Sequence, residues 1–178
     1  MSWFLRSKLD QTSGYLAQLT LPIAVPVAAQ SASAGATYEV PLWCSGDYTA
    51  QTGLPGPGTN ISTSAPFTGD PGRYVILHAY LVPITGITGG GATVQATANI
   101  QLYDSTGASV GTLFSLLYST GVNATALAQN SLGSPSTTVR NIAQGCVIHK
   151  NETLSFQWVQ SGTTGLALPA ATIVLDLI

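Results

Sequence analysis

The chain has 178 residues, which suits one domain with a hydrophobic core, or one domain plus a tail, and makes a multidomain enzyme unexpected. Charged residues make up only 7% of the sequence and hydrophobic residues 45%, and so apolar a composition excludes a disordered chain. Five basic residues against seven acidic ones leave a net charge of -2, which excludes the basic surface that binds a nucleic-acid backbone.

So low a charge also bears on the surface of the folded protein. A freely soluble monomer is normally kept dispersed by many surface charges of mixed sign. A surface with few charges suits a protein held in a permanent assembly, because few charges are desolvated when large contacts form. The composition favours this interpretation, and a secreted, threonine-rich β domain stays open as the alternative.

The start of the chain has some features of a secretory signal peptide, because a basic pair precedes an apolar stretch over residues 16–29. Asp10, Pro22 and Pro26 interrupt that pattern. The two prolines also exclude a membrane-spanning helix, which needs an uninterrupted apolar run of roughly 20 residues. We therefore expect a protein that is made in the cytoplasm, kept there until assembly, and not bound to a membrane.

Residues 1–36 differ from the remainder and predict an extended amino-terminal arm. Apolar residues of its second half fall on odd positions around two prolines. Because proline cannot donate a ladder hydrogen bond, this segment fits a sheet edge or a neighbouring molecule but no central strand. We expect the arm to dock on another subunit, and the alternative is a first strand packed on its own domain. The expected docking residues are Trp3, Phe4, Leu5, Leu19, Leu21, Ile23, Val25 and Val27.

From Thr37 onward the apolar pattern has a period of two, which predicts a β domain over residues 37–178. The clearest strand is Val94–Tyr103, whose even positions are apolar and odd positions mostly polar, so that one face is expected in the core and the other in water. A turn at 104–107 offers a glycine for the positive φ of a short loop. A strand over 109–118 completes a predicted hairpin.

A second hairpin is predicted from Ile142–His149 and Glu152–Val159, joined at Lys150-Asn151, where asparagine tolerates the left-handed conformation. Its expected inward-facing residues are Leu154, Phe156 and Trp158. The other predicted strands are Tyr38–Trp43, Arg73–Val82 and Thr172–Ile178.

About eight strands with no credible amphipathic helix predict an all-β fold, an antiparallel β-sandwich of the jelly-roll kind with an extended arm. The connections 44–72 and 121–140 are longer than usual, and long connections often carry function.

Two short patterns resemble catalytic or phosphate-binding motifs but lack their context. The sequence around Ser109 fits a nucleophile elbow, which needs a strand, a sharp turn and a helix, whereas Ser109 leaves a hairpin turn and enters a strand. The run Gly89–Gly91 lacks the lysine and helix of a phosphate loop. The acidic residues are scattered, and no His/Cys spacing resembles a metal site. We expect no enzyme activity, cofactor, metal or small-molecule substrate.

The two histidines have different expected environments. Tyr74, His78 and Tyr80 alternate along one predicted strand and form a possible surface patch facing a partner. The interpretation favoured for His78 is instead a hydrogen-bonded histidine in the second layer of the sandwich. His149 adjoins a turn and is expected to be solvated.

Trp43 and Trp158 have a structural and a functional interpretation. Together they could form a sugar-stacking platform, but Trp158 shares the inward face of its strand, which favours the core. Cys44 and Cys146 allow one disulfide, whereas a cytoplasmic protein keeps its cysteines as thiols. We expect buried thiols.

The whole chain resembles the small β-sandwich proteins that decorate tailed-phage capsids, known as decoration or cement proteins. The resemblance rests on the apolar arm at 19–27, the strands of 37–178 and the low charge. It implies a non-enzymatic homo-oligomer, often a trimer, on the exterior of the virion, seated at junctions between copies of the major capsid protein. It implies no genome contact, since Arg6 and Lys8 supply too little charge for a basic arm.

Two other functions stay open. One is a receptor- or carbohydrate-binding module of a fibre or tail, using the two long connections. The other is a subunit of a surface filament that donates its amino-terminal strand to the next copy.

Overall fold

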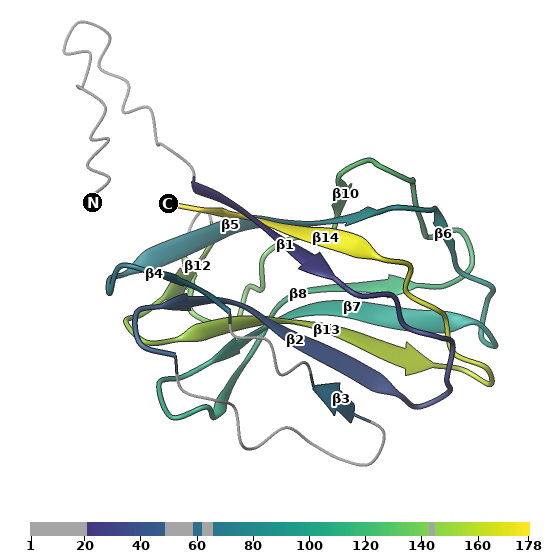
Figure 1. The fold of residues 1–178 in the computed structure, drawn as a ribbon, viewed down its shortest axis with the longest axis horizontal. Coiled ribbons are helices and arrows are strands. Elements are labelled where there is room, and N and C mark those ends of the chain that lie inside the picture. Colours follow the sequence, from purple (N-terminus) through teal and green to yellow (C-terminus); the bar gives the residue numbers. More distant parts are fainter. Residues whose placement is uncertain (1–20, 49–58, 62–65, 143–144) are drawn as a thin grey trace, which may run out of the picture.

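The computed structural model describes residues 21–48, 59–61, 66–142 and 145–178, which form fourteen strands. Two sheets face each other (Figure 1). No helix occurs in the described ranges, so the chain is an antiparallel β-sandwich, as its period-two pattern predicts. None of these residues forms a helix that could cross a membrane.

The first sheet has β1 and β11 at its two ends, with β10 also on β5. Its order is β1 (Leu21–Val27), β14 (Ala171–Leu177), β5 (Tyr74–Pro83), β12 (Gly145–Ile148) and β11 (Asn141–Ile142), and β10 spans Asn130–Ser131.

The second sheet has β8 at one edge and two short strands beside β2 at the other. Its order is β3 (Thr59–Ile61), β2 (Thr37–Ser45), β13 (Thr153–Ser161), β7 (Gln95–Tyr103) and β8 (Ser109–Tyr118), with β4 (Phe67–Gly69) also on β2. The pairing of β3 and β4 with β2 is parallel. A separate pair joins β6 (Ile87–Thr88) and β9 (Asn123–Ala124).

The core lies between the two sheets and consists of the residues that the alternation predicts. The even positions of β7 from Ala96 to Leu102 are 0% exposed, as are Leu154, Phe156 and Trp158 of β13. The odd positions of β7 differ from the expectation of a wet face, because they are half-buried and Tyr103 is 3% exposed.

The β7–β8 hairpin turns as predicted, through Asp104 and Gly107. The Asp104 Oδ1 atom accepts hydrogen bonds from the Thr106 amide at 2.8 Å and the Ala108 amide at 3.0 Å. These donors, with the Thr106 hydroxyl as the strongest, lower the pKa of Asp104 because they favour its charged form. Gly107 has a φ of 83°, in the left-handed region that favours glycine.

We expect Gly107→Ala to destabilise the protein by about 1 kcal/mol, because a Cβ atom makes this φ unfavourable. Urea unfolding should show a lower midpoint with an unchanged slope. The matched control is Gly107→Asn, which should lose less, since asparagine tolerates the left-handed region. Equal losses for both variants would contradict the explanation.

The segment Leu21–Val27 is a strand of the domain, which differs from the expectation that residues 1–36 form an arm separate from it. It pairs antiparallel with β14 along its whole length. Val25 and Val27 are 6% and 4% exposed and lie in the core. For this segment the alternative interpretation, a first strand on its own domain, is the one the structure shows. The expected docking residues Trp3, Phe4, Leu5 and Leu19 lie outside the described residues.

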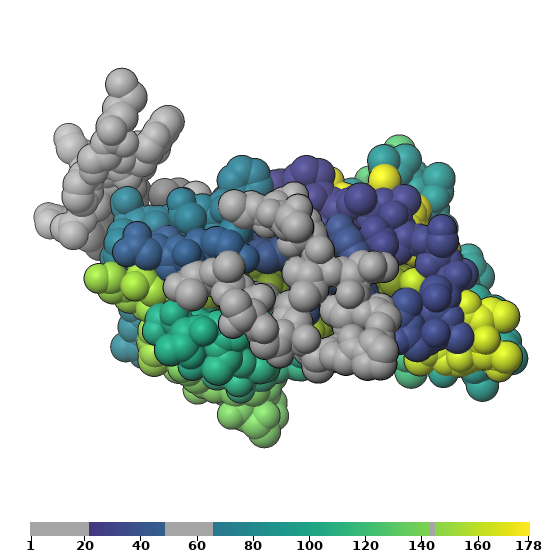
Figure 2. Space-filling view, turned by 60° about the horizontal axis from the view of Figure 1, so that its bottom comes forward, coloured from purple at the N-terminus to yellow at the C-terminus, as the bar shows by residue number. Residues whose placement is uncertain are grey.

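The connection after β1 is also attached to the sandwich. Figure 2 shows it beside the connection between β13 and β14 at one end of the molecule. There Gln30 and Leu168 exchange two backbone hydrogen bonds, of 2.7 and 3.0 Å. The Gln160 side chain adds bonds to the backbone of Ser31 and Ser33. The domain therefore begins no later than residue 21, and not at residue 37.

The prolines of β1 occupy an edge, as the sequence predicts. The Ile84 amide donates to the Ala170 carbonyl at 2.9 Å, so the even residues of β14 direct their backbone groups at β5. Its odd residues then face the odd residues of β1, because antiparallel ladders alternate. Pro22 and Pro26 consequently have their donor-free nitrogens on the outer edge of the sheet.

Candidate functional site

The outer surface of the first sheet is a candidate docking surface, which we call the A face. Three strands place nine side chains there in three rows across the sheet. The rows are Pro22, Asp176 and His78; Ala24, Val174 and Tyr80; and Pro26, Thr172 and Val82. All nine are exposed or half-buried, and Asp176 is the one carboxylate among them.

The structure brings together two members of the predicted patch and separates the third. The rings of His78 and Tyr80 lie on the A face with centroids 6.0 Å apart. The ring of Tyr74 packs edge-on against Trp43, with centroids 4.8 Å apart. His78 is exposed, so the interpretation that favoured a second-layer position for it is wrong.

An irregularity in β5 explains this separation. Asp176 pairs with His78 while Leu177 pairs with Ile76, which leaves Leu77 as an extra residue on β5. Such a bulge reverses which side of the sheet the following residues face. Ile76 is accordingly 0% exposed, although it has the same parity as His78. No local sequence pattern predicts this bulge.

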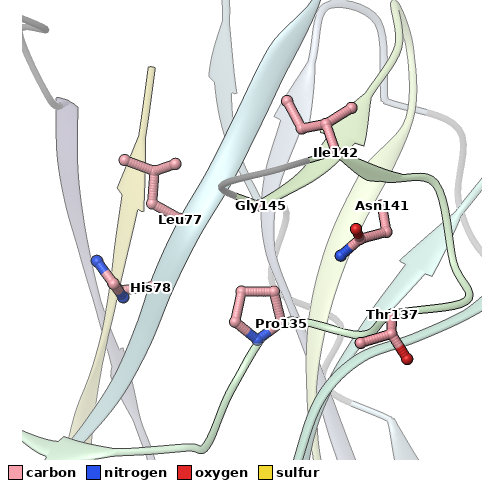
Figure 3. A pocket seen from close by; sticks show the side chains of 7 residues that line it. All are labelled: Leu77, His78, Pro135, Thr137, Asn141, Ile142 and Gly145. Atoms are coloured by element: carbon pink, nitrogen blue, oxygen red, sulfur yellow. The ribbon is translucent and has the colours of Figure 1, made fainter.

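A groove of about 530 Å³ adjoins the A face at the far edge of β5. Its lining includes Leu77, His78, Pro135, Asn141, Ile142 and Gly145. Figure 3 shows the side chains of Leu77, Pro135 and Ile142 around the space, with His78 at its border. His78 therefore belongs to both surfaces, and the long 121–140 connection supplies part of the wall.

The outer surface of the second sheet carries a polar cluster that sequence reasoning missed. Glu39 is 0% exposed, and its Oε2 atom accepts a hydrogen bond of 2.7 Å from Gln157 Nε2. Gln101 Nε2 donates to Gln157 Oε1 at 3.1 Å, and the Tyr103 hydroxyl lies 3.4 Å from Gln157 Nε2. We call these four residues the Glu39 cluster. The mixture of polar and apolar positions along β2 gave no sign that Glu39 is buried.

Burial changes the acidity of two members of the cluster. It raises the pKa of Glu39, an effect that hydrogen bonds from Gln157, Tyr103 and Ser155 partly offset. It also raises the pKa of Tyr103, and the neighbouring Glu39 raises it further. Both side chains are thus favoured in their neutral forms.

An ion pair fixes the end of the long connection to the turn between β12 and β13. These two strands lie in different sheets, so the second hairpin predicted from Ile142–His149 and Glu152–Val159 does not form. The Arg140 guanidinium binds the Glu152 carboxylate, and the Glu152 Oε2 atom also accepts the His149 amide at 2.7 Å. Asn151 in the adjoining turn has a φ of 62°, as predicted. The His149 side chain is 55% exposed, which confirms that it is solvated.

The tryptophans and cysteines are structural. Trp43 and Trp158 are 2% and 0% exposed, so they offer no surface platform for a sugar. Cys44 and Cys146 are buried free thiols, as predicted, and burial raises the pKa of each, which makes them poor nucleophiles.

The described residues include no catalytic context for Ser109, which begins β8 directly after a turn. Within the same ranges no three His, Cys, Asp or Glu side chains gather closely enough to hold a metal ion.

Comparisons with known proteins supply no relative. No family model, no curated protein and no solved structure matches this chain. The function is therefore argued from the surfaces of the molecule itself.

Proposed function

We propose that this chain is a non-enzymatic structural protein of a virion that decorates and stabilises a phage capsid. The observation that carries the proposal is the A face, whose nine positions include one carboxylate and no Lys or Arg. Few charged groups lose water when such a surface is covered, so a large contact forms at little electrostatic cost. The protein would be made in the host cytoplasm and act on the capsid exterior.

The partners in this proposal are the major capsid protein and further copies of this chain, as a homotrimer. Two features of the A face support docking between proteins. Its three antiparallel strands form a continuous surface, and the Tyr80 ring beside His78 offers the kind of aromatic contact that is enriched at interfaces. Nucleic acid, membrane and small-molecule partners are not part of the proposal.

The fold leaves fewer residues of the predicted arm available for docking on another protein. Val25 and Val27 are in the core and cannot contact a partner. Leu21 and Ile23 belong to β1. Docking through the beginning of the chain therefore rests on Trp3, Phe4, Leu5 and Leu19.

The order of the eight longer strands supports a jelly roll. The series β1-β14-β5-β12 faces the series β2-β13-β7-β8, and a jelly roll has eight strands in two such sheets. Jelly rolls occur in viral capsid and lectin domains. This observation favours a second candidate function, a subunit that builds the capsid shell itself.

The other two functions have less support. A sugar-binding module would have to use the groove beside β5, because Trp43 and Trp158 are buried. A filament subunit that exchanges its first strand needs an open place beside β14, and the chain's own β1 fills that place. A glycan array tests the first of these alternatives.

We expect Val174→Glu, in the middle row of the A face, to weaken binding to capsid shells at least about tenfold, because an unpaired carboxylate would be desolvated in the contact. Stability should change little, since Val174 is half-buried on the outer side of its sheet. Co-sedimentation with shells that lack the protein measures the binding.

The matched control is Ser109→Glu, which adds the same charge at an exposed position of β8 in the other sheet. It should bind as wild type does. Equal binding by both variants would show that the A face does not contact the capsid shell. Shells that cannot form without this protein would favour the second candidate function.

A further inference from the structure

The strongest unexplained group is Glu39, a buried carboxylate for which the described residues provide no counter-charge. The chain has five Lys and Arg residues, which are Arg6, Lys8, Arg73, Arg140 and Lys150. Arg140 is held by Glu152, Arg73 and Lys150 are exposed, and Arg6 and Lys8 lie outside the described residues. No Lys or Arg occurs between residues 9 and 72, so the connection from β2 to β5 contributes no cation before Arg73.

Every described side chain that hydrogen-bonds Glu39 is uncharged. β13 contributes Gln157 and Ser155, and β7 contributes Tyr103. The short β3, which pairs in parallel with Thr37–Glu39, consists of Thr, Asn and Ile and has no ionisable residue. Tyr103 is therefore the one titratable group found facing Glu39 from these strands, and it is neutral at ordinary pH.

The described donors leave one of the two carboxylate oxygens without a hydrogen bond. Gln157 serves the Oε2 atom, while the Oε1 atom is buried and has no hydrogen-bond partner among the described residues. A carboxylate has about four acceptor sites and needs strong donors or a cation when it is buried. A neutral carboxylic acid has a much smaller desolvation cost at the same place.

We propose that Glu39 is a pH-sensitive latch, held as the neutral acid in the closed sandwich and loosening the contact of β3 with β2 when it ionises. In that step the O–H bond of the acid breaks, the proton passes to water or buffer, and both electrons stay on the carboxylate. Ile61 of β3 pairs directly with Glu39. Since β3 has only three residues, its pairing with β2 is much shorter than that of β13 and is less able to resist the entry of water.

The direction of the pH effect follows from the raised pKa of Glu39. Between the ordinary pKa of about 4.3 and the raised value, the unfolded chain has lost the proton and the folded chain keeps it. Stability is therefore complete below the ordinary pKa and decreases as pH rises. The folding equilibrium constant falls by up to about tenfold per pH unit in that window and is steady above it.

The test compares urea unfolding of the full chain and of Glu39→Gln between about pH 5 and pH 8. Glutamine has a similar shape and cannot ionise, so the contribution of Glu39 to the pH slope should disappear in this variant. The two histidines are common to both proteins and do not affect the comparison. Asp104→Asn is the matched control, because hydrogen bonds lower the pKa of Asp104 and keep it ionised over this range, so this variant should keep the wild-type slope.

Two further measurements bear on the same proposal. Tyr103→Phe removes a donor that favours the charged form of Glu39. The pH range over which stability decreases should therefore extend to higher pH. Amide exchange at Thr37–Val40, corrected for its intrinsic pH dependence, should accelerate across the window in wild type and not in Glu39→Gln.

Parallel pH profiles of wild type and Glu39→Gln would overturn the proposal. If Glu39→Gln does not fold, carboxyl-carbon NMR of labelled wild type decides the question instead. A Glu39 midpoint above the ordinary range supports the latch, and a midpoint near about 4.3 refutes it.

Discussion

Replacing Arg140 by methionine should destabilise the protein by roughly 3 kcal/mol at neutral pH, near the lower end of the range for breaking a buried ion pair. The variant keeps most of the side-chain length but leaves the Glu152 carboxylate, 5% exposed, without its cation. The lower end applies because the Arg140 side chain is 29% exposed and the His149 amide continues to serve the carboxylate. Urea unfolding measures the loss from the shift of the midpoint.

A double-mutant cycle separates the pair from other effects of the change. Arg140→Met combined with Glu152→Gln should recover much of the loss, because no buried charge remains. The φ of 46° at position 140 is common to all members of the cycle, so backbone strain cancels. A double variant as unstable as Arg140→Met alone would show that the loss comes from packing and not from the unpaired carboxylate.

Trp158→Ala should cost roughly 3–5 kcal/mol, the range for removing a large buried aromatic side chain. The indole is 0% exposed and packs against Tyr118, with ring centroids 5.4 Å apart. Its Nε1 atom donates to the Leu166 carbonyl at 2.7 Å. Since domains are stable by about 5–15 kcal/mol, this variant should be marginally folded. Thermal and urea unfolding measure the effect.

Trp158→Phe separates the two contributions of the indole. Phenylalanine retains much of the apolar volume but leaves the Leu166 carbonyl without its donor, which should cost about 1–3 kcal/mol. A loss for Trp158→Ala no greater than that for Trp158→Phe would mean that the neighbouring rings collapse into the vacated space.

The strands with one buried face were predictable because their alternation is strict. The predicted strands 94–103 and 109–118 correspond to β7 and β8 within one residue at each end, and the glycine of the turn between them has the predicted positive φ. The prolines of β1 likewise predicted a sheet edge. That this edge belongs to the chain's own domain was not predictable, because an apolar alternating segment fits a neighbouring subunit equally well.

The candidate surfaces depend on features that no local pattern encodes. One extra residue in β5 turns His78 outward although Ile76 is in the core. The Glu39 cluster joins side chains from three strands far apart in the sequence, and its burial depends on strand order, which the sequence does not reveal. Long-range pairing of this kind places the acidic and aromatic residues on their final faces.

The prolines at the outer edge of β1 also bear on how the protein behaves when concentrated. An exposed sheet edge is the usual starting point for cross-β aggregation, because its free amides and carbonyls template a further strand. Here Pro22 and Pro26 offer no amide to an incoming strand, so runaway fibre growth from that side is disfavoured. A chain with a net charge of only -2 has little electrostatic repulsion between copies. The missing amide donors at this edge oppose aggregation instead.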